Sequence, residues 1–160
     1  NGWQHCLTIP RELYIENGAV YQRPVCEIDT LSWKQEEGTH CRFEREMVKI
    51  ETTLQEGIPA EIRIGTEENG LTIHMEADRI QMTFLNKKGE PSACGGGRAI
   101  RIGRTASEIR HALVLIDNSI AEIFVNEGEV VMTTRIYLEK PERMITVNGC
   151  RTCEIWKTEE

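Results

Sequence analysis

The sequence predicts an all-β fold, a sandwich of two antiparallel sheets with little helix. Strand-length segments recur along the whole chain, together with turn signals such as Asn-Gly. Several of these segments alternate apolar and polar residues, which indicates sheets with one buried and one solvated face. Roughly ten or more short strands with little helix are typical of a β-sandwich or a β-barrel. The two-sided alternation favours the sandwich, because a second sheet must cover the first.

The first third of the chain is predicted to contain a hairpin, a helix and an extended segment. Residues 12–16 and 19–22 flank Asn17-Gly18, a pair that favours a tight hairpin turn because both residues accept positive φ. Residues 24–34 carry apolar residues at three-residue spacing, which predicts one short helix. Residues 41–53 are predicted to be extended.

The middle of the chain shows the clearest strand pattern. Residues 60–65, 71–76 and 80–84 each alternate apolar with polar residues, as expected for antiparallel strands that cover a core. Residues 86–97 contain Lys87-Lys88-Gly89 and three consecutive glycines at 95–97, and they predict a loop. A further strand is predicted at 97–102.

A meander of three antiparallel strands is predicted in the last third. Residues 108–116 end in a continuous apolar run, which is typical of a strand buried on both faces. The chain can reverse at Asp117-Asn118-Ser119, where side chains hydrogen-bond their own backbone. Strands at 120–125 and 130–137 follow, separated by a second turn that contains Gly128.

The chain is predicted to be one domain covering residues 1–160. Strands at 144–147 and 153–157 close it around Asn148-Gly149. A chain of this length buries about 68–70% of the surface that it would expose unfolded, which is enough for a core.

Composition argues against several kinds of partner. The 26 acidic residues oppose 19 basic ones, a net charge of −7, and nucleic-acid binding needs clustered Lys and Arg. The same charge disfavours a membrane surface, and no apolar run approaches the ~20 residues that span a bilayer. The N-terminus lacks the basic start and apolar centre of a signal peptide. Because the chain has a core of its own, its six cysteines are interpreted as reduced thiols of a cytoplasmic protein.

No motif in the chain supplies a complete catalytic, metal or cofactor site. Cys150-x-x-Cys153 has the spacing of half a zinc site, but no second pair of ligands accompanies it, so two thiols flanking a tight turn are the expectation. Cys94 opens a Gly-rich stretch that lacks the Lys-Ser/Thr ending of a phosphate loop and leads into a strand. Asp117 is interpreted as a turn residue. We therefore expect no catalytic residue, no metal and no cofactor.

Aromatic residues are too scattered to predict a sugar-binding surface. Trp3, Trp33 and Trp156 lie far apart in the sequence, and tryptophans mostly pack in cores or interfaces. Each is expected in one of these two places.

Two stretches resemble glycoside hydrolase family 32. Residues 2–13, GWQHCLTIPREL, with the later Gln22-Arg23-Pro24, are similar to the segment that joins the family's catalytic propeller to its C-terminal domain. Residues 114–135 are similar to the family segment D-x-S-x-x-E-I-F and its G-E-V-V-M-T-x-R-I continuation. Together these motifs bracket nearly the whole chain in the family's order. Bacterial sucrose-6-phosphate hydrolases and invertases are the most similar in character.

The resemblance implies a non-catalytic accessory domain. The family joins a five-bladed propeller to a concanavalin-like or lectin-like jelly-roll sandwich, and its retaining chemistry uses an Asp nucleophile, a Glu acid/base and a second Asp on the propeller. Their motifs, Asn-Asp-Pro, Glu-Cys and Arg-Asp-Pro, do not occur here. The expected function is to pack on and stabilise the catalytic propeller of a β-fructosidase that hydrolyses sucrose or sucrose 6-phosphate, with a possible homodimer.

Four apolar residues in this joining segment are expected to face the propeller: Trp3, Leu7, Ile9 and Pro10. The alternative interpretation is a free-standing, lectin-like carbohydrate-binding module, since a shared fold does not fix the function.

Overall fold

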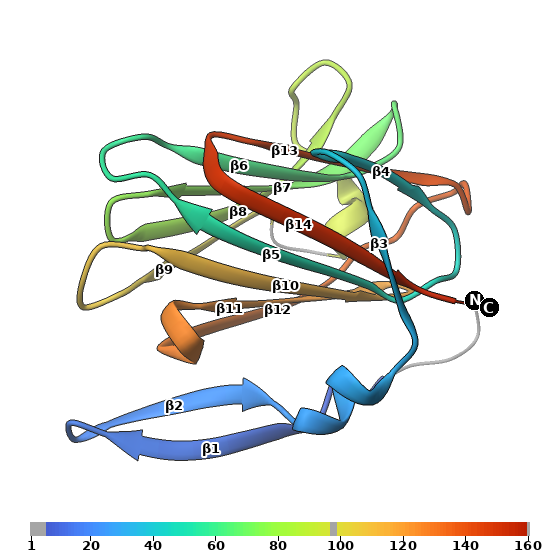
Figure 1. Cartoon of the computed structure of the whole chain (residues 1–160). Coiled ribbons are helices and arrows are strands. Elements are labelled where there is room, and N and C mark those ends of the chain that lie inside the picture. The colour runs from blue at the N-terminus through green and yellow to red at the C-terminus, as the bar shows by residue number, and fades with distance from the viewer. Residues whose placement is uncertain (1–5, 97–98, 160) are drawn as a thin grey trace.

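The predicted two-sheet sandwich is confirmed. The computed structural model describes residues 6–96 and 99–159, and in this part of the chain two sheets of six antiparallel strands face each other, with a separate two-stranded hairpin beside them (Figure 1). The first sheet has the order β12-β11-β10-β5-β14-β3 and the second β4-β13-β6-β7-β8-β9. The only helical segments among the described residues are short 3-10 turns, so the prediction of little helix also holds.

The strands have the following bounds. The hairpin is β1 (Arg11–Glu16) and β2 (Ala19–Pro24). The first sheet contains β3 (Trp33–Glu36), β5 (Val48–Leu54), β10 (His111–Asp117), β11 (Ile120–Val125), β12 (Val130–Arg135) and β14 (Cys150–Thr158). The second contains β4 (His40–Phe43), β6 (Ala60–Gly65), β7 (Asn69–Glu76), β8 (Arg79–Asn86), β9 (Ile100–Arg104) and β13 (Arg143–Asn148). Three 3-10 turns complete the chain, η1 (Cys26–Thr30), η2 (Ala93–Gly95) and η3 (Asn126–Gly128).

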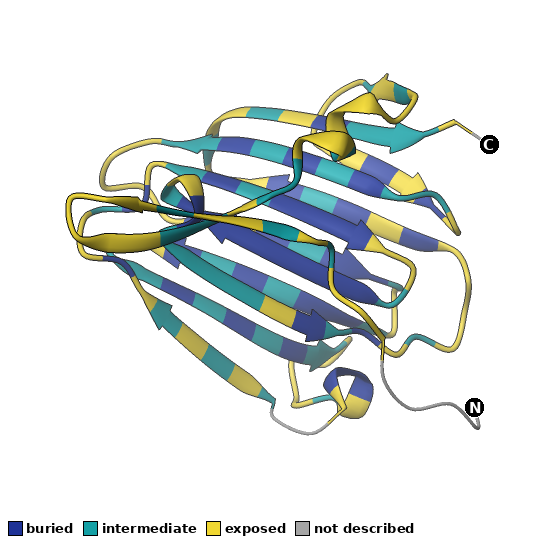
Figure 2. Ribbon diagram, turned by 90° about the horizontal axis from the view of Figure 1, so that it is seen from below, coloured by how far each residue is buried: buried dark blue, intermediate teal, exposed yellow. Residues whose placement is uncertain are grey.

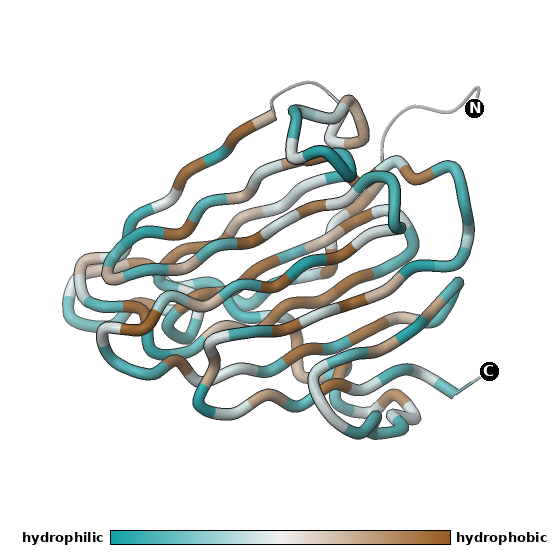
Figure 3. The backbone as a smooth tube through the Cα atoms, turned by 90° about the horizontal axis from the view of Figure 1, so that it is seen from above, coloured by the Kyte–Doolittle hydropathy of each residue, from teal (hydrophilic) through white to brown (hydrophobic). Residues whose placement is uncertain are grey.

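The core lies between the two sheets and follows the predicted alternation. On β7 and β8 every second residue is fully buried, and these residues are Leu71, Ile73, Met75, Ile80, Met82 and Phe84. The same alternation appears as bands of hydropathy along the strands in Figure 3. Burial of a large apolar side chain contributes about 1.5–3 kcal/mol, so this face supplies much of the stability of the second sheet.

Two sequence-based assignments were wrong. Residues 41–53 are not one extended segment, because the chain turns between β4 and β5, which belong to opposite sheets. The Glu46 carboxylate stabilises that turn by accepting the backbone N–H groups of Glu44 and Arg45 at 2.8 and 3.0 Å. The helix expected at 24–34 is limited to η1, and the strand β3, which sequence analysis missed, follows it.

The three predicted strands of the meander are confirmed as β10, β11 and β12, in that order in the sheet. All six residues of β11 are buried. One face of β11 contributes Ala121, Ile123 and Val125 to the core between the sheets. The other face, with Glu122 and Phe124, points away from that core and is covered by the N-terminal segment.

That N-terminal segment forms a third layer. The hairpin of β1 and β2 and the η1 turn lie across the outer face of the first sheet, on the side opposite the second sheet (Figures 1 and 2). We call residues 6–30 the N-terminal arm. The outer face of the second sheet has no comparable cover from the described residues.

Candidate functional site

A buried carboxylate anchors the N-terminal arm to the sandwich. Glu122 on β11 is fully buried. It accepts the backbone N–H of Ile9 at 2.6 Å and the guanidinium of Arg11 at 2.5 Å. Arg11 also donates to the hydroxyl of Thr133 at 2.6 Å and lies over the Phe124 ring, 5.4 Å from its centroid. A buried charge is tolerated only when it is paired and hydrogen-bonded, and both conditions are met here.

The two strands of the hairpin also contact the turn after β11. The hydroxyl of Tyr14 donates to the carbonyl oxygen of Glu127 at 2.8 Å, and Arg23 forms an ion pair with the Glu127 carboxylate at 3.3 Å. Gly128 lies so close to the arm that a Cβ built on it would be 1.9 Å from the carbonyl oxygen of Gln22. The hairpin is therefore held on the sandwich by contacts from both of its strands.

This fixed hairpin presents an unpaired apolar face to solvent. Leu13, Ile15 and Val20 are 69%, 77% and 57% exposed. Ile15 pairs with Val20 in the hairpin register, and Leu13 lies two residues before Ile15 on the same strand, so the three side chains share one face. We call them the hairpin face. Contiguous exposed apolar residues mark interaction sites.

The predicted propeller-facing residues have different environments. Leu7 is 93% exposed and Pro10 is exposed, while Ile9 is half-buried beside Glu122. Trp3 lies outside the described residues. Sequence analysis missed the hairpin face, although the alternation of Leu13 and Ile15 with Glu12, Tyr14 and Glu16 in β1 was the available signal.

The Cys150-x-x-Cys153 pair lies within β14 rather than flanking a turn. A bulge between Cys150 and Thr152 lets both thiols pack against the core. Burial raises the pKa of Cys153 to about 11 and also raises that of Cys150, so both thiols are protonated at neutral pH. Within residues 6–96 and 99–159 no group of three or more His, Cys, Asp or Glu side chains could hold a metal ion.

Two tryptophans that are distant in sequence come together in space. The ammonium of Lys49 lies 5.4 Å from the ring centroid of Trp33 on β3 and 4.7 Å from that of Trp156 on β14. The indole N–H of Trp33 also donates to the carbonyl oxygen of Ile28 at 2.9 Å, which ties the arm to the edge of the sheet. The cation–π contacts give both rings a structural role.

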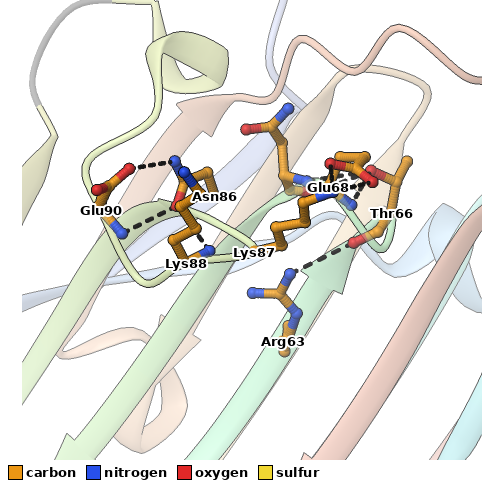
Figure 4. Close-up of polar contacts among 8 residues, drawn as sticks. Arg63, Thr66, Glu68, Asn86, Lys87, Lys88 and Glu90 are labelled. Carbon is orange, nitrogen blue, oxygen red and sulfur yellow. Dashed lines mark hydrogen bonds and ion pairs between the residues drawn. The ribbon is translucent and has the colours of Figure 1, made fainter.

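A polar cluster at one end of the second sheet is also structural. Lys87 pairs with Glu68 at 2.9 Å, and Arg63 donates to the carbonyl oxygen of Thr66 at 3.3 Å (Figure 4). The Asn86 side chain accepts the backbone N–H groups of Lys88 and Glu90, at 2.9 and 3.0 Å. These bonds fix the two turns after β6 and β8. The loop at 86–97 is thus ordered by its own side chains as far as it is described, and it includes η2, in which Cys94 is buried.

Comparison with known proteins identifies the family of this chain. Residues 97–159 match the family model described as glycosyl hydrolases family 32 C terminal. The chain carries the C-terminal domain of glycoside hydrolase family 32. It is 31% identical over 155 residues to a probable sucrose-6-phosphate hydrolase of Vibrio cholerae, covering 92% of this chain and 27% of that protein. It is 30% identical to the sucrose-6-phosphate hydrolase of Staphylococcus xylosus, covering 88% and 31%.

Solved structures share the fold of this family 32 domain. The Bombyx mori family 32 β-fructofuranosidase superposes with a TM-score of 0.71 at 17% identity, over 96% of this chain and 33% of that one. The sucrose-6-phosphate hydrolase of Lactobacillus gasseri gives a TM-score of 0.62 at 18% identity, over 93% and 33%. The chain thus spans a third or less of the length of these proteins. No described residue belongs to a helix long and apolar enough to cross a membrane.

Proposed function

We propose that residues 1–160 are one non-catalytic accessory domain of a retaining β-fructosidase that hydrolyses sucrose or sucrose 6-phosphate, and that this domain packs on a catalytic propeller elsewhere in the same protein. The similarity to sucrose-6-phosphate hydrolases supports the parent activity, and the short span of the match supports an accessory role. In this proposal the parent enzyme is cytoplasmic, where its thiols stay reduced.

The observation that carries the proposal is the exposed hairpin face on a hairpin that is bonded to the sandwich. Glu122 and the η3 turn hold the hairpin through Arg11, Tyr14 and Arg23, yet Leu13, Ile15 and Val20 remain exposed on it. Leu7 and Pro10, two of the predicted propeller-facing residues, directly precede the hairpin in the chain and are also exposed, so the contact region in this proposal includes them. A catalytic domain that lies before the arm would cover this region.

The first step of the test is to read the coding sequence upstream of the Asn1 codon. An open frame encoding Asn-Asp-Pro, Arg-Asp-Pro and Glu-Cys supports the proposal. A start codon directly before this domain overturns the proposal, and the free-standing sugar-binding module then becomes the preferred interpretation. Titration of the chain with fructose, sucrose and short fructans then measures that alternative, because a passive domain gives no saturable signal.

The second step compares two double variants in the chain and in its longer parent. Leu13→Ser/Ile15→Ser should leave the melting temperature of the isolated chain unchanged and lower that of the parent by several degrees. The matched control is Ile100→Ser/Ile102→Ser on β9, which removes apolar residues that are 54% and 53% exposed and should change neither protein. If both double variants lowered the melting temperature of the parent equally, the hairpin face would be excluded as the contact with the propeller. Dimerisation through this face would instead appear as a concentration-dependent mass of the isolated chain.

A further inference from the structure

A hollow that includes no residue of the hairpin face is lined by cations and neutral polar groups. It has a volume of about 280 Å³ and lies where the turn after β10 meets the end of β12 and the start of β13. Its polar lining consists of Asn118, Ser119, Arg135, Tyr137 and Arg143, and no described carboxylate lines it. Two guanidinium groups from different strands therefore meet at one hollow, in a chain that has a net charge of −7.

Arg143 makes this hollow unusual because it is buried without an acidic partner. It is 8% exposed. One of its terminal nitrogens donates to the carbonyl oxygen of Asn118, and its guanidinium lies over the Phe43 ring, 5.7 Å from the centroid. No acid among the described residues forms an ion pair with it, and its Nε has no hydrogen-bond partner there. Burying a guanidinium without a counter-charge is costly, so an anion at this position would be stabilised.

Further donors surround the same position. Arg135 contacts the Cys6 sulfur at 2.8 Å and lies over the Tyr137 ring, 4.9 Å from its centroid. The hydroxyl of Ser119 has no hydrogen-bond partner within residues 6–96 and 99–159. The nearest acid in sequence to Arg143 is Glu142, which pairs with Arg42 at 3.5 Å and lines a neighbouring hollow that Arg143 also borders, but it forms no ion pair with Arg143.

We propose that this hollow binds a phosphate group, either as the free ion or on a small phosphate monoester. A phosphate monoester presents three acceptor oxygens and close to two negative charges, and the planar guanidinium group is suited to bind it in a bidentate manner. A lone carboxylate would use fewer of the donors. The volume approaches the lower end of the roughly 300–1,000 Å³ that small-ligand sites occupy, so it has room for more than the phosphate alone.

The larger hollow at the other end of β10 differs in its charges. It has a volume of about 850 Å³, and although Arg110 and Arg151 line it, so do Glu56 and Glu108. This mixed lining offers no excess of positive charge. It therefore provides a matched control for a variant that removes one arginine.

The proposal is tested by calorimetric titration of the chain at constant ionic strength. Inorganic phosphate and glucose 6-phosphate are the probes, with chloride and glucose as references. Saturable binding of both phosphates, with neither reference binding, is the expected result. Tighter binding of glucose 6-phosphate identifies an ester as the ligand, and equal affinities identify the free ion. Phosphate that binds no better than chloride overturns the proposal.

Variants then locate the binding position. Arg135→Gln is expected to weaken phosphate binding at least tenfold, and Ser119→Ala several-fold, whereas Arg110→Gln should stay within twofold of the original chain. Arg143→Gln is not relied on, because loss of a buried side chain can unfold the protein. Equal weakening by Arg135→Gln and Arg110→Gln would mean diffuse attraction to net charge and would refute the site. The outcome is independent of the accessory-domain proposal, since every measurement uses this chain alone.

Discussion

Replacing Arg11 by Gln should destabilise the protein far more than breaking a surface ion pair. The carboxylate of Glu122 is fully buried, and Arg11 supplies its only counter-charge among the described residues, at 2.5 Å. Arg11→Gln leaves that carboxylate with the Ile9 N–H and a neutral amide. Removing one partner of a buried pair costs about 3–5 kcal/mol, because the remaining charge stays desolvated. We expect a loss of about 3 kcal/mol, the lower figure, since the Ile9 hydrogen bond remains.

The assay is urea denaturation at pH 7, followed by fluorescence of the tryptophans. The matched control is Arg104→Gln, which breaks an ion pair with Asp78 of 2.7 Å between side chains that are 63% and 46% exposed. Exposed pairs contribute about 0–1 kcal/mol, so the control should lose less than 1 kcal/mol. Adding Glu122→Gln to Arg11→Gln should recover part of the loss, since no buried charge is then left unpaired.

Two results would refute this reasoning. If Arg11→Gln and Arg104→Gln lost equal stability, the Arg11–Glu122 pair would behave as a surface pair. If the double variant Arg11→Gln/Glu122→Gln lost as much stability as Arg11→Gln and Glu122→Gln lose separately when added together, the two side chains would not be coupled.

Two further predictions concern the arm and a core thiol. Gly128→Ala should lower the free energy of unfolding by about 2–3 kcal/mol and make the hairpin more sensitive to proteolysis, because the new Cβ would clash with the Gln22 carbonyl oxygen at a residue with positive φ. The control is Gly57→Ala, where φ is +72° and the space around the Cβ is open. It should cost only about 1 kcal/mol in denaturation. Burial raises the pKa of Cys41 from 9.0 to about 11, so the neutral thiol is favoured in the fold. The contribution of Cys41 to stability is therefore full below pH 9 and should fall by about 2 kcal/mol as the pH rises to 11. Cys41→Ala should flatten this decline in denaturation curves at pH 8 and 10.5, and an unchanged slope would contradict the assignment.

The sandwich was predictable because its strands have strong local signals. The alternation in β7 and β8 specifies which face is buried, and Asn17-Gly18 specifies the first hairpin. The break between β4 and β5 was missed because both segments are extended and nothing local shows that they enter opposite sheets. β3 was missed because its pattern is short and half-polar, and its pairing with β14 is non-local.

The candidate contact region was only partly predictable. Leu7 and Pro10 could be named from their place in the chain, and both are exposed. The resemblance singled out Glu122 as part of a motif, but it assigned the residue no role. Its role as the anchor of the arm depends on Ile9 and Arg11, more than a hundred residues away in sequence.

The sequence by itself determined the class of fold, the meander of β10 to β12 and the family, because alternation and turn residues act over a few neighbouring positions. Only the tertiary structure decided that β11 is buried on both faces, since the cover over its outer face comes from the other end of the chain. The tertiary structure also brought Arg135 and Arg143 to one hollow lined by no described acid. The physical reason is that burial and counter-charge are properties of a position in space, and sequence distance does not record them.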